Sequence, residues 1–168
     1  MKRAVTAYIS LGGNLGNEVK RFTQALETMN NWQGIQVSAV SQLYRTEPQD
    51  DADQPWFSNQ VAALVCAPEL TPNDLLDSML RLEQKLGRNR DPNRRFGPRA
   101  IDLDLLLFGT MVLRSKKLCL PHPRMCERAF VLIPLLEIAS SLRLPDGEPV
   151  SACLKKIQYS LEDRNIFQ

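Results

Sequence analysis

RRFGPRAIDLDLLLFG, residues 94–109, joins a run of basic residues to an apolar segment that carries two aspartates. Its second half, residues 101–108, is otherwise apolar, and a run of this length after a Gly-Pro break predicts a buried strand. Alternate side chains of a strand share a face, so we expect Asp102 and Asp104 side by side, with Cα atoms about 6.5 Å apart. Two carboxylates so close at the edge of a core raise each other's pKa unless a positive charge lies between them.

A hard cation would balance this pair of carboxylates. Mg²⁺ is usually held by one or two protein carboxylates, while water and substrate phosphates fill its other positions. A lone Asp-x-Asp is common on surfaces, and an arginine-rich loop alone is typical of a solvated segment. Here the aspartates lie within Ile and Leu residues, where an unpaired carboxylate is costly, and arginines suited to phosphate lie directly upstream. The two features together predict metal-assisted phosphoryl chemistry, and the arginines are Arg88, Arg90, Arg94, Arg95 and Arg99.

The composition is that of an ordinary globular protein. With 168 residues, 43% of them hydrophobic and 24% charged, the chain is expected to form one domain over residues 1–168. No apolar run approaches the length of a membrane span. Polar residues interrupt the first apolar segment, so the start predicts a strand rather than a signal peptide. We therefore expect a cytoplasmic protein without a membrane partner.

Charge and cysteine usage exclude further classes of protein. A net charge of +2 provides no global field for nucleic acid, and the basic charge is concentrated within residues 81–99, which indicates a small anionic ligand. The four cysteines are far apart and form no Cys-x-x-Cys pair, which argues against a zinc site and against a disulfide framework. No heptad pattern demands a partner subunit, so we expect a monomer.

The expected elements follow the order strand, helix, strand, strand, helix, strand. Gly12 and Gly13 are expected to end the first strand, Asn14 or Asn17 to cap the first helix, and Thr71 to cap the second. This is the split βαβ order of ferredoxin-like α+β folds, which predicts an antiparallel sheet with both helices on one face. The strands are expected at residues 4–11, 35–44, 57–66 and 101–108, and the helices at 17–31 and 71–86.

The rest of the chain is expected to add a third layer. Residues 111–120 predict one more strand, and residues 129–139 predict an apolar helix in which Pro134 marks a kink or the first turn. That helix would cover the other face of the sheet, giving a three-layer αβα arrangement. A short helix is expected at residues 151–157.

Several residues carry no functional assignment from pattern alone. The glycine-rich loop at residues 12–16 fits neither G-x-x-x-x-G-K-[ST] nor G-x-G-x-x-G, which favours a plain turn. His122 is the only histidine, and a histidine on a loop is more often a surface residue than a catalyst. For Phe57 and Phe130 the pattern favours core positions.

The segment RFGPRAIDLDLL, residues 95–106, resembles the signature of the 6-hydroxymethyl-7,8-dihydropterin pyrophosphokinase family of folate biosynthesis. An Asp-x-Asp alone would be a weak signal, but further segments look like that family, in its order, across nearly the whole chain. These segments are YISLGGNLGN near the start, YRTEP at 44–48, FSN at 57–59, LEQKLGRNR at 82–90, PHPRMCERAFVLIPLLEIA at 121–139 and LPDG at 144–147.

The resemblance implies a ferredoxin-like fold and the transfer of pyrophosphate from ATP to the hydroxymethyl oxygen of the pterin, with release of AMP. ATP would be the co-substrate, and Asp102 and Asp104 match the ligands of two Mg²⁺ ions. The matching basic and ATP-contacting residues are Arg88, Arg90, Arg99, Glu83, Leu105, Lys117, His122 and Arg128. The pterin would lie between Phe57 and Phe130, with contacts from Thr46, Asn59 and Asp102.

The chain also departs from the family pattern. Phe96 stands where some members have tryptophan, Phe57 where some have tyrosine, and Leu80 where some have glutamine, which leaves the detailed ATP contacts open. No general base is identified. A metal-dependent nuclease or phosphohydrolase would use the same aspartates and arginines. A ferredoxin-like RNA-binding module would need exposed aromatics and a broadly basic face, whereas this chain has 7% aromatic residues.

Overall fold

The computed structural model describes residues 3–89, 92–93 and 97–168. Over these residues a mixed seven-stranded sheet has the order β5-β1-β4-β3-β9-β8, and β2 also pairs with β4. The strands of this sheet are β1 (Val5–Gly13), β2 (Ile35–Val40), β3 (Tyr44–Thr46), β4 (Phe57–Cys66), β5 (Asp102–Phe108), β8 (Ser160–Glu162) and β9 (Asn165–Phe167). The other elements are β6 (Leu113–Arg114), β7 (Cys119–Leu120), a 3-10 turn η1 (Met125–Glu127), and the helices α1 (Glu18–Asn30), α2 (Pro72–Lys85), α3 (Ala129–Ile138) and α4 (Val150–Lys155).

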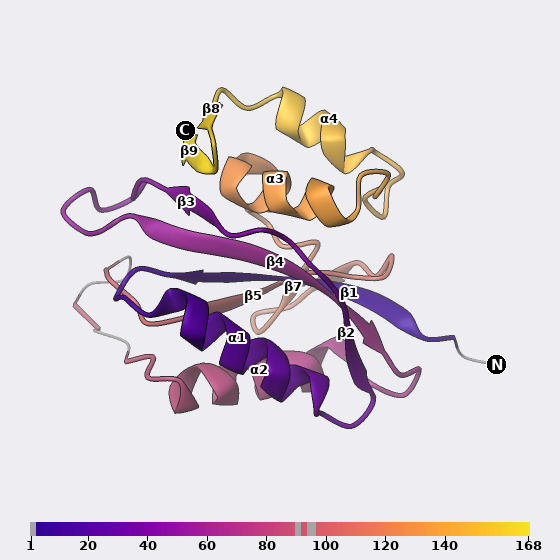
Figure 1. The fold of residues 1–168 in the computed structure, drawn as a ribbon. Coiled ribbons are helices and arrows are strands. Elements are labelled where there is room, and N and C mark those ends of the chain that lie inside the picture. Colours follow the sequence, from indigo (N-terminus) through magenta and orange to yellow (C-terminus); the bar gives the residue numbers. More distant parts are fainter. Residues whose placement is uncertain (1–2, 90–91, 94–96) are drawn as a thin grey trace.

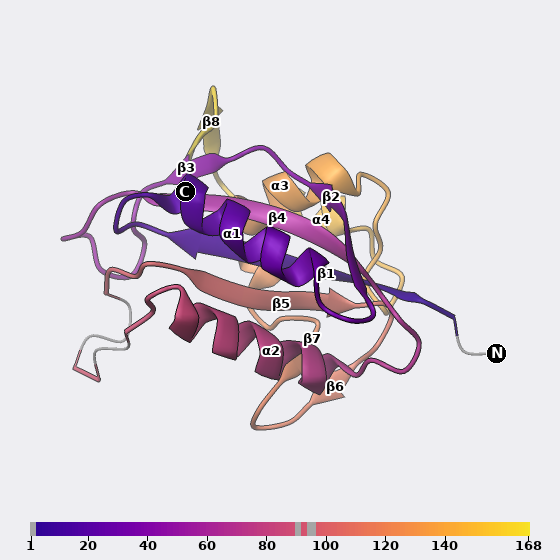
Figure 2. The same ribbon diagram turned by 60° about the horizontal axis from the view of Figure 1, so that its bottom comes forward.

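Helices lie on both sides of the sheet. Figure 1 shows α1 and α2 on one face and α3 and α4 on the other. In the turned view of Figure 2, α2 runs along β5, which it contacts directly. The prediction of a central sheet with helices on both faces is confirmed.

The centre of the sheet is formed by β1 and β4, which pair antiparallel from Val5 opposite Cys66 to Gly13 opposite Ser58. Because helices cover both faces, β4 is buried along most of its length rather than on alternate residues. Its bounds coincide with the predicted third strand. Residues of both strands line the pocket that is described below.

The start of α2 follows the sequence prediction. The Thr71 side chain accepts the backbone N–H of Asp74, and the Asp74 carboxylate accepts the backbone N–H of Thr71, a capping box that satisfies two donors at the helix start. Pro72 occupies the first turn, where its missing N–H has no cost. Leu75, Met79 and Leu82 then form the buried face of the helix.

The first turn of the chain differs from the prediction. The first strand continues two residues beyond its predicted end, because Gly12 and Gly13 both pair with β4, and Gly13 is its last residue. Neither asparagine caps α1 with its side chain. Asn17 stands at the N-cap with a left-handed φ of 58° and no side-chain capping bond. The Asn14 amide instead donates to Gln54 and to the carbonyl of Pro55, because the loop after β3 covers it.

The second expected strand, at residues 35–44, is two strands, β2 and β3. Ser41 separates them because its Oγ accepts the Val61 N–H at 3.0 Å, so a side chain replaces the backbone partner in the ladder.

The prediction of a single strand at residues 111–120 is also wrong. This segment is a short hairpin of β6 and β7, closed by Ser115, whose Oγ accepts the Leu118 N–H at 3.0 Å.

The sheet is not wholly antiparallel, because β9 runs parallel to β3, with Arg45 opposite Asn165 and Thr46 opposite Ile166. The hairpin of β8 and β9 was not among the expected elements. Its strands have three residues each and β8 is exposed throughout, so no hydrophobic alternation identifies them.

Helix α3 is apolar almost throughout, since it lies between the sheet and α4. Its residues Val131, Leu132 and Leu135 are buried, and the helix continues through Pro134. The prediction that it covers the second face is confirmed. Among the described residues, no helix combines the length and the apolarity needed to cross a membrane.

Candidate active site

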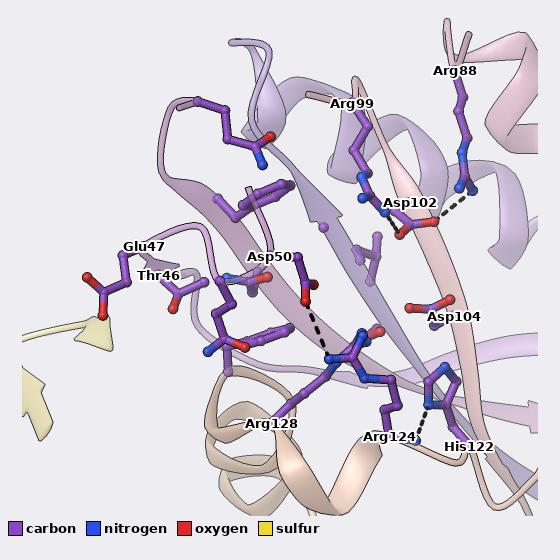
Figure 3. Close-up of a pocket in the computed structure, with 18 of the residues that line it drawn as sticks. Thr46, Glu47, Asp50, Arg88, Arg99, Asp102, Asp104, His122, Arg124 and Arg128 are labelled. Atoms are coloured by element: carbon purple, nitrogen blue, oxygen red, sulfur yellow. Dashed lines mark hydrogen bonds and ion pairs between the residues drawn. The ribbon is translucent and has the colours of Figure 1, made fainter. Parts of the chain in front are cut away.

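A pocket with a volume of about 370 Å³ lies beside β1, β4 and β5, where they meet the loop after β3 and the start of α3. Most residues expected to bind a ligand line this pocket: Thr46, Phe57, Asn59, Arg88, Arg99, Asp102, Asp104, His122, Arg128 and Phe130. Figure 3 shows the two aspartates on one strand, with basic side chains around them.

Asp102 and Asp104 lie on the same face of β5, as the strand period predicts. They are opposite Gly12 and Ser10 of β1. Asp102 is held by two guanidinium groups: its Oδ1 lies 2.7 Å from Nη1 of Arg88, and its Oδ2 lies 2.6 Å from Nη1 of Arg99. Each carboxylate oxygen of Asp102 is therefore paired with a positively charged group.

Asp104 has different surroundings. It is partly exposed to the pocket but is otherwise enclosed by protein, and this burial, followed by the negative charge of Asp102, raises the pKa of Asp104 from 3.8 to about 7. The guanidinium groups of Arg128 and Arg88 act in the opposite direction but do not compensate. A further cation beside Asp104 would favour its charged form.

Glu83 of α2 holds the Arg88 side chain in place. Its side chain is only 2% exposed, its Oε1 accepts the backbone N–H of Leu103 at 2.7 Å, and its Oε2 lies 2.5 Å from Nη1 of Arg88. Burial is the main cause that raises the pKa of Glu83. Glu83 does not line the pocket with the aspartates. It lies beside a separate hollow near the end of α2, with Leu80 and Asn89.

Asn14 fixes Arg99, and no sequence signal singled it out for this. The Asn14 Oδ1 accepts the Arg99 N–H at 2.9 Å, and the Asn14 N–H donates to the Arg99 carbonyl at 3.0 Å. Gly13 makes this approach possible, because a Cβ there would lie 2.6 Å from the carbonyl oxygen of Ala100. The end of β1 therefore holds the backbone that carries Arg99.

Two phenylalanines line the pocket, one from the sheet and one from helix α3. Phe57 begins β4 and has the Arg99 guanidinium 5.7 Å from its ring centroid, and Phe130 in α3 has the Arg128 guanidinium at 5.6 Å. Asn59 is 6% exposed, and its buried Nδ2 has no hydrogen-bond partner among the described residues. A buried amide without a partner is costly, so this group is available to a ligand that enters the pocket.

His122 is a neutral donor in this pocket. Burial and the charge of Arg128 lower its pKa from 6.5 to about 4. Its Nδ1 accepts the backbone N–H of Arg124 at 3.2 Å. The hydrogen of the neutral ring is therefore on Nε2, which we assign from this bond.

Besides Glu83, three further expected site residues either do not line the pocket or are not described. Leu105 points into the core on the other face of β5. Lys117 forms a surface ion pair with Asp77, with Nζ and Oδ1 2.7 Å apart. Arg90 lies outside the described residues.

The pocket also contains residues that sequence reasoning missed. Glu47, Gln49 and Asp50 come from the loop after β3, and Arg124 precedes η1. Asp50 Oδ1 and Arg124 Nη2 are 3.8 Å apart across the pocket. Glu47 and Arg124 lie in segments that resemble the family, but the resemblance gave them no role. The acidic composition of the loop gives no indication of which carboxylate faces inward.

The donor set fits a hard cation. The described residues contain no group of three or more His, Cys, Asp or Glu side chains able to hold a metal ion. Two carboxylates in a pocket with several arginines nevertheless fit Mg²⁺, which takes few protein ligands when phosphate oxygens complete its shell. Such a site is typical of enzymes that transfer phosphoryl groups from a nucleotide.

Comparisons with known proteins agree with this class. The model of the family described as 7,8-dihydro-6-hydroxymethylpterin-pyrophosphokinase (HPPK) matches residues 8–140. The 2-amino-4-hydroxy-6-hydroxymethyldihydropteridine pyrophosphokinase of Methylorubrum extorquens is 44% identical over 92% of this chain and 94% of its own. The enzyme of the same name from Pseudomonas aeruginosa is 45% identical over 87% and 90%. The chain therefore belongs to the HPPK family.

A solved structure supports the fold alone. A triple mutant of HPPK-DHPS from Plasmodium falciparum is similar with a TM-score of 0.72 at 14% identity. The match covers 92% of this chain but only 42% of that one, so this chain spans less than half the length of the solved protein.

Proposed function

We propose that this protein transfers pyrophosphate from ATP to the hydroxymethyl group of 6-hydroxymethyl-7,8-dihydropterin, giving the pterin diphosphate and AMP. The observation that carries this proposal is that one pocket combines the paired Asp102 and Asp104, the arginines around them, and the unpartnered amide of Asn59. The first two features suit a triphosphate, and the third suits a flat polar heterocycle.

The pterin ring is proposed to lie between Phe57 and Phe130. Stacking on aromatic faces favours a flat ring, and the Asn59 Nδ2 would donate to a ring acceptor that replaces the partner it lacks. Thr46 lines the same pocket, and its hydroxyl already donates to the carbonyl of Ile166, so a contact with the pterin would come from its backbone. These contacts would fix the orientation of the hydroxymethyl group.

The basic residues are proposed to bind the triphosphate. Glu83 holds the Arg88 guanidinium group, and Asn14 holds the Arg99 backbone. Guanidinium groups form charge-assisted bonds with phosphate oxygens. Neutral His122 donates from Nε2 without adding charge, and Arg128 brings a second positive charge to the Asp104 side. Fixed donors of this kind stabilise the charge that develops in the transition state without reorganisation.

Asp102 and Asp104 would hold the metal, for which we propose two Mg²⁺ ions. When bound, the metal neutralises charge on the phosphates and on the entering and leaving oxygens. Asp102 is paired with Arg88 and Arg99, so its carboxylate would exchange part of this contact for the cation. Among the described residues Asp104 forms no such ion pair, and a cation beside it would favour the charged form that burial disfavours.

The finer description of the fold is also part of this proposal. The chain order β1-α1-β2 and β4-α2-β5 and the strand order β5-β1-β4-β2 support a ferredoxin-like core, to which α3, α4 and the hairpin of β8 and β9 are added. We propose that the chain works as a single-domain monomer in the cytoplasm.

The decisive experiment is incubation with ATP and Mg²⁺, with and without the dihydropterin. We expect AMP to be released only when the pterin is present. Release of ADP or phosphate without pterin would instead support a phosphohydrolase. Filter binding to RNA at moderate salt tests the third alternative, and we expect no retention. The Asp146→Asn variant should release AMP as the wild type does, because this aspartate is exposed in the turn before α4. It therefore provides a control for variants of the pocket aspartates.

A further inference from the structure

The C-terminal hairpin of β8 and β9 lies outside the part of the chain that the family model matches, which ends at residue 140. Its position nevertheless brings it next to the pocket. β9 extends the sheet beside β3, the Arg45 N–H donates to the carbonyl of Arg164 at 2.8 Å, and Ile166 is fully buried. Figure 1 shows the hairpin near β3 and α3; β9 pairs with β3, and Ile166 packs in one cluster with Ala129 of α3.

One end of the hairpin supports the β4 side of the pocket. The Thr46 hydroxyl donates to the Ile166 carbonyl at 3.1 Å, which fixes the last residue of β3. Phe167 packs edge-on against Trp56, with ring centroids 5.3 Å apart and an interplanar angle of 82°. Trp56 directly precedes Phe57, so this contact fixes the backbone from which the Phe57 ring enters the pocket.

The same end of the hairpin also supports the α3 side, through the residue that follows β9. The Gln168 Oε1 accepts the Ala129 N–H at 2.7 Å, and its Nε2 donates to the Glu127 carbonyl at 2.6 Å. Ala129 is the first residue of α3, and no side chain of the N-cap residue, Arg128, caps the helix. Gln168 therefore satisfies an N–H that a helix start leaves open, from a distant part of the chain.

We propose that Phe167 and Gln168 are positioning residues of the pterin site, which together set the separation of Phe57 and Phe130. The inference rests on the proposed function, because it assigns the two rings to the pterin. Neither residue lines the pocket itself, so both act through the backbones they hold. Ile166 joins the two sides, since it packs with Tyr44 of β3 and Ala129 of α3 in one cluster, against which Phe130 also packs.

The test compares Gln168→Ala and Phe167→Ala with Gln158→Ala, which removes an exposed glutamine just before the hairpin. We expect the first two variants to weaken pterin binding about three- to tenfold, since each loses one or two positioning contacts. Binding of the ATP analogue should stay within about twofold, and Gln158→Ala should match the wild type. Gln168→Glu keeps the acceptor for the Ala129 N–H and should recover part of the loss.

Hydrogen exchange of the ligand-free protein provides a readout that needs no pterin. The Ala129 amide should exchange faster in Gln168→Ala and remain protected in Gln168→Glu and Gln158→Ala. Equal weakening of pterin and nucleotide binding, or unchanged pterin binding with a faster Ala129 amide, overturns the positioning role. If Gln168→Ala does not fold, Gln168→Glu decides by the same comparison. If the wild type shows no pterin-dependent AMP release, the proposed function is overturned instead. The exchange result would still report on the contact between Gln168 and the Ala129 N–H.

Discussion

Asp102 and Asp104 are two residues apart on one strand face, yet their environments differ. Asp102 is balanced by Arg88 and Arg99, whereas burial dominates the environment of Asp104 and raises its pKa to about 7. Strand alternation places both on one face, so the difference arises from their positions along the strand. Among the described residues, Asp102 rather than Asp104 forms the ion pairs with Arg88 and Arg99. The sequence predicts the shared face, but not this asymmetry.

Neutralising either aspartate should abolish turnover. In Asp102→Asn and Asp104→Asn we expect AMP release to fall by at least about hundredfold, because a lost metal ligand removes several kcal/mol of charge stabilisation. Asp104→Asn should keep or gain stability in the absence of ligands. Asp102→Asn should lose about 1–3 kcal/mol, since it leaves two arginines without their partner. Near-normal turnover in both variants would contradict the metal site, and Asp146→Asn serves as the control.

The raised pKa of Asp104 predicts a pH dependence of stability in the metal-free protein. Between pH 3.8 and about 7 the folded protein holds a proton at Asp104 that the unfolded chain has released. Its contribution is therefore fully present below pH 3.8 and is lost as the pH rises to about 7. Asparagine cannot titrate. The free energy of unfolding of the wild type, minus that of Asp104→Asn, should therefore decrease as the pH rises from 3.8 to about 7.

Urea unfolding in EDTA at several pH values measures this difference. Asp146→Asn, which removes an exposed carboxylate, should follow the wild-type curve. A difference between the wild type and Asp104→Asn that stays constant across the window would show that the Asp104 pKa is not raised.

At the scale of elements, prediction succeeded where local signals coincide with burial. α2 has a capping residue, a proline at its start and a regular apolar face, and β4 ends in a continuous apolar run over residues 61–66. Prediction failed where a long-range contact decides. Ser41 divides a strand through its bond to Val61, and the Asn14 side chain is taken by Gln54 and Pro55 rather than by the helix start.

The end of β1 allows a matched test of a close approach between elements. In Gly13→Ala the new Cβ would lie 2.6 Å from the Ala100 carbonyl oxygen, so the segment that carries Arg99 must move. We expect a loss of about 1–3 kcal/mol in the free energy of unfolding, as for other overpacked sites. In Gly12→Ala the nearest atom is 3.7 Å away, an ordinary contact, so its loss should be smaller. Equal unfolding midpoints for the two variants would contradict this account.

Across the whole molecule, the site combines segments from nearly the full length of the chain. Strand period and the run of arginines identified its charged half, and the family resemblance supplied its aromatic half. Sequence could not indicate that Glu83 is buried behind β5, that Lys117 pairs on the surface, or that Gln168 reaches α3. Each of these depends on which face of an element meets another element, which local patterns do not determine.

The division of the pocket into two halves predicts selective losses of affinity. Phe130→Ala and Asn59→Ala should weaken pterin binding more than ATP binding, because a stacking face and a hydrogen bond each contribute about 1–3 kcal/mol. Calorimetric titration with the pterin and with a non-hydrolysable ATP analogue measures both. Leu161→Ala, an exposed apolar residue of β8, is the control. Equal losses for both ligands would indicate general unfolding rather than a pterin site.

The strand that carries the two aspartates is also the end strand of the sheet. A free strand edge can pair with a strand of a second molecule and begin aggregation. On β5 the Leu103 N–H is occupied by the Glu83 carboxylate, and the Leu106 carbonyl accepts the His122 N–H at 2.8 Å. These contacts interrupt the outer edge from within the same chain. The bonds that place Arg88 and His122 beside the pocket therefore also protect the protein against edge-to-edge self-association.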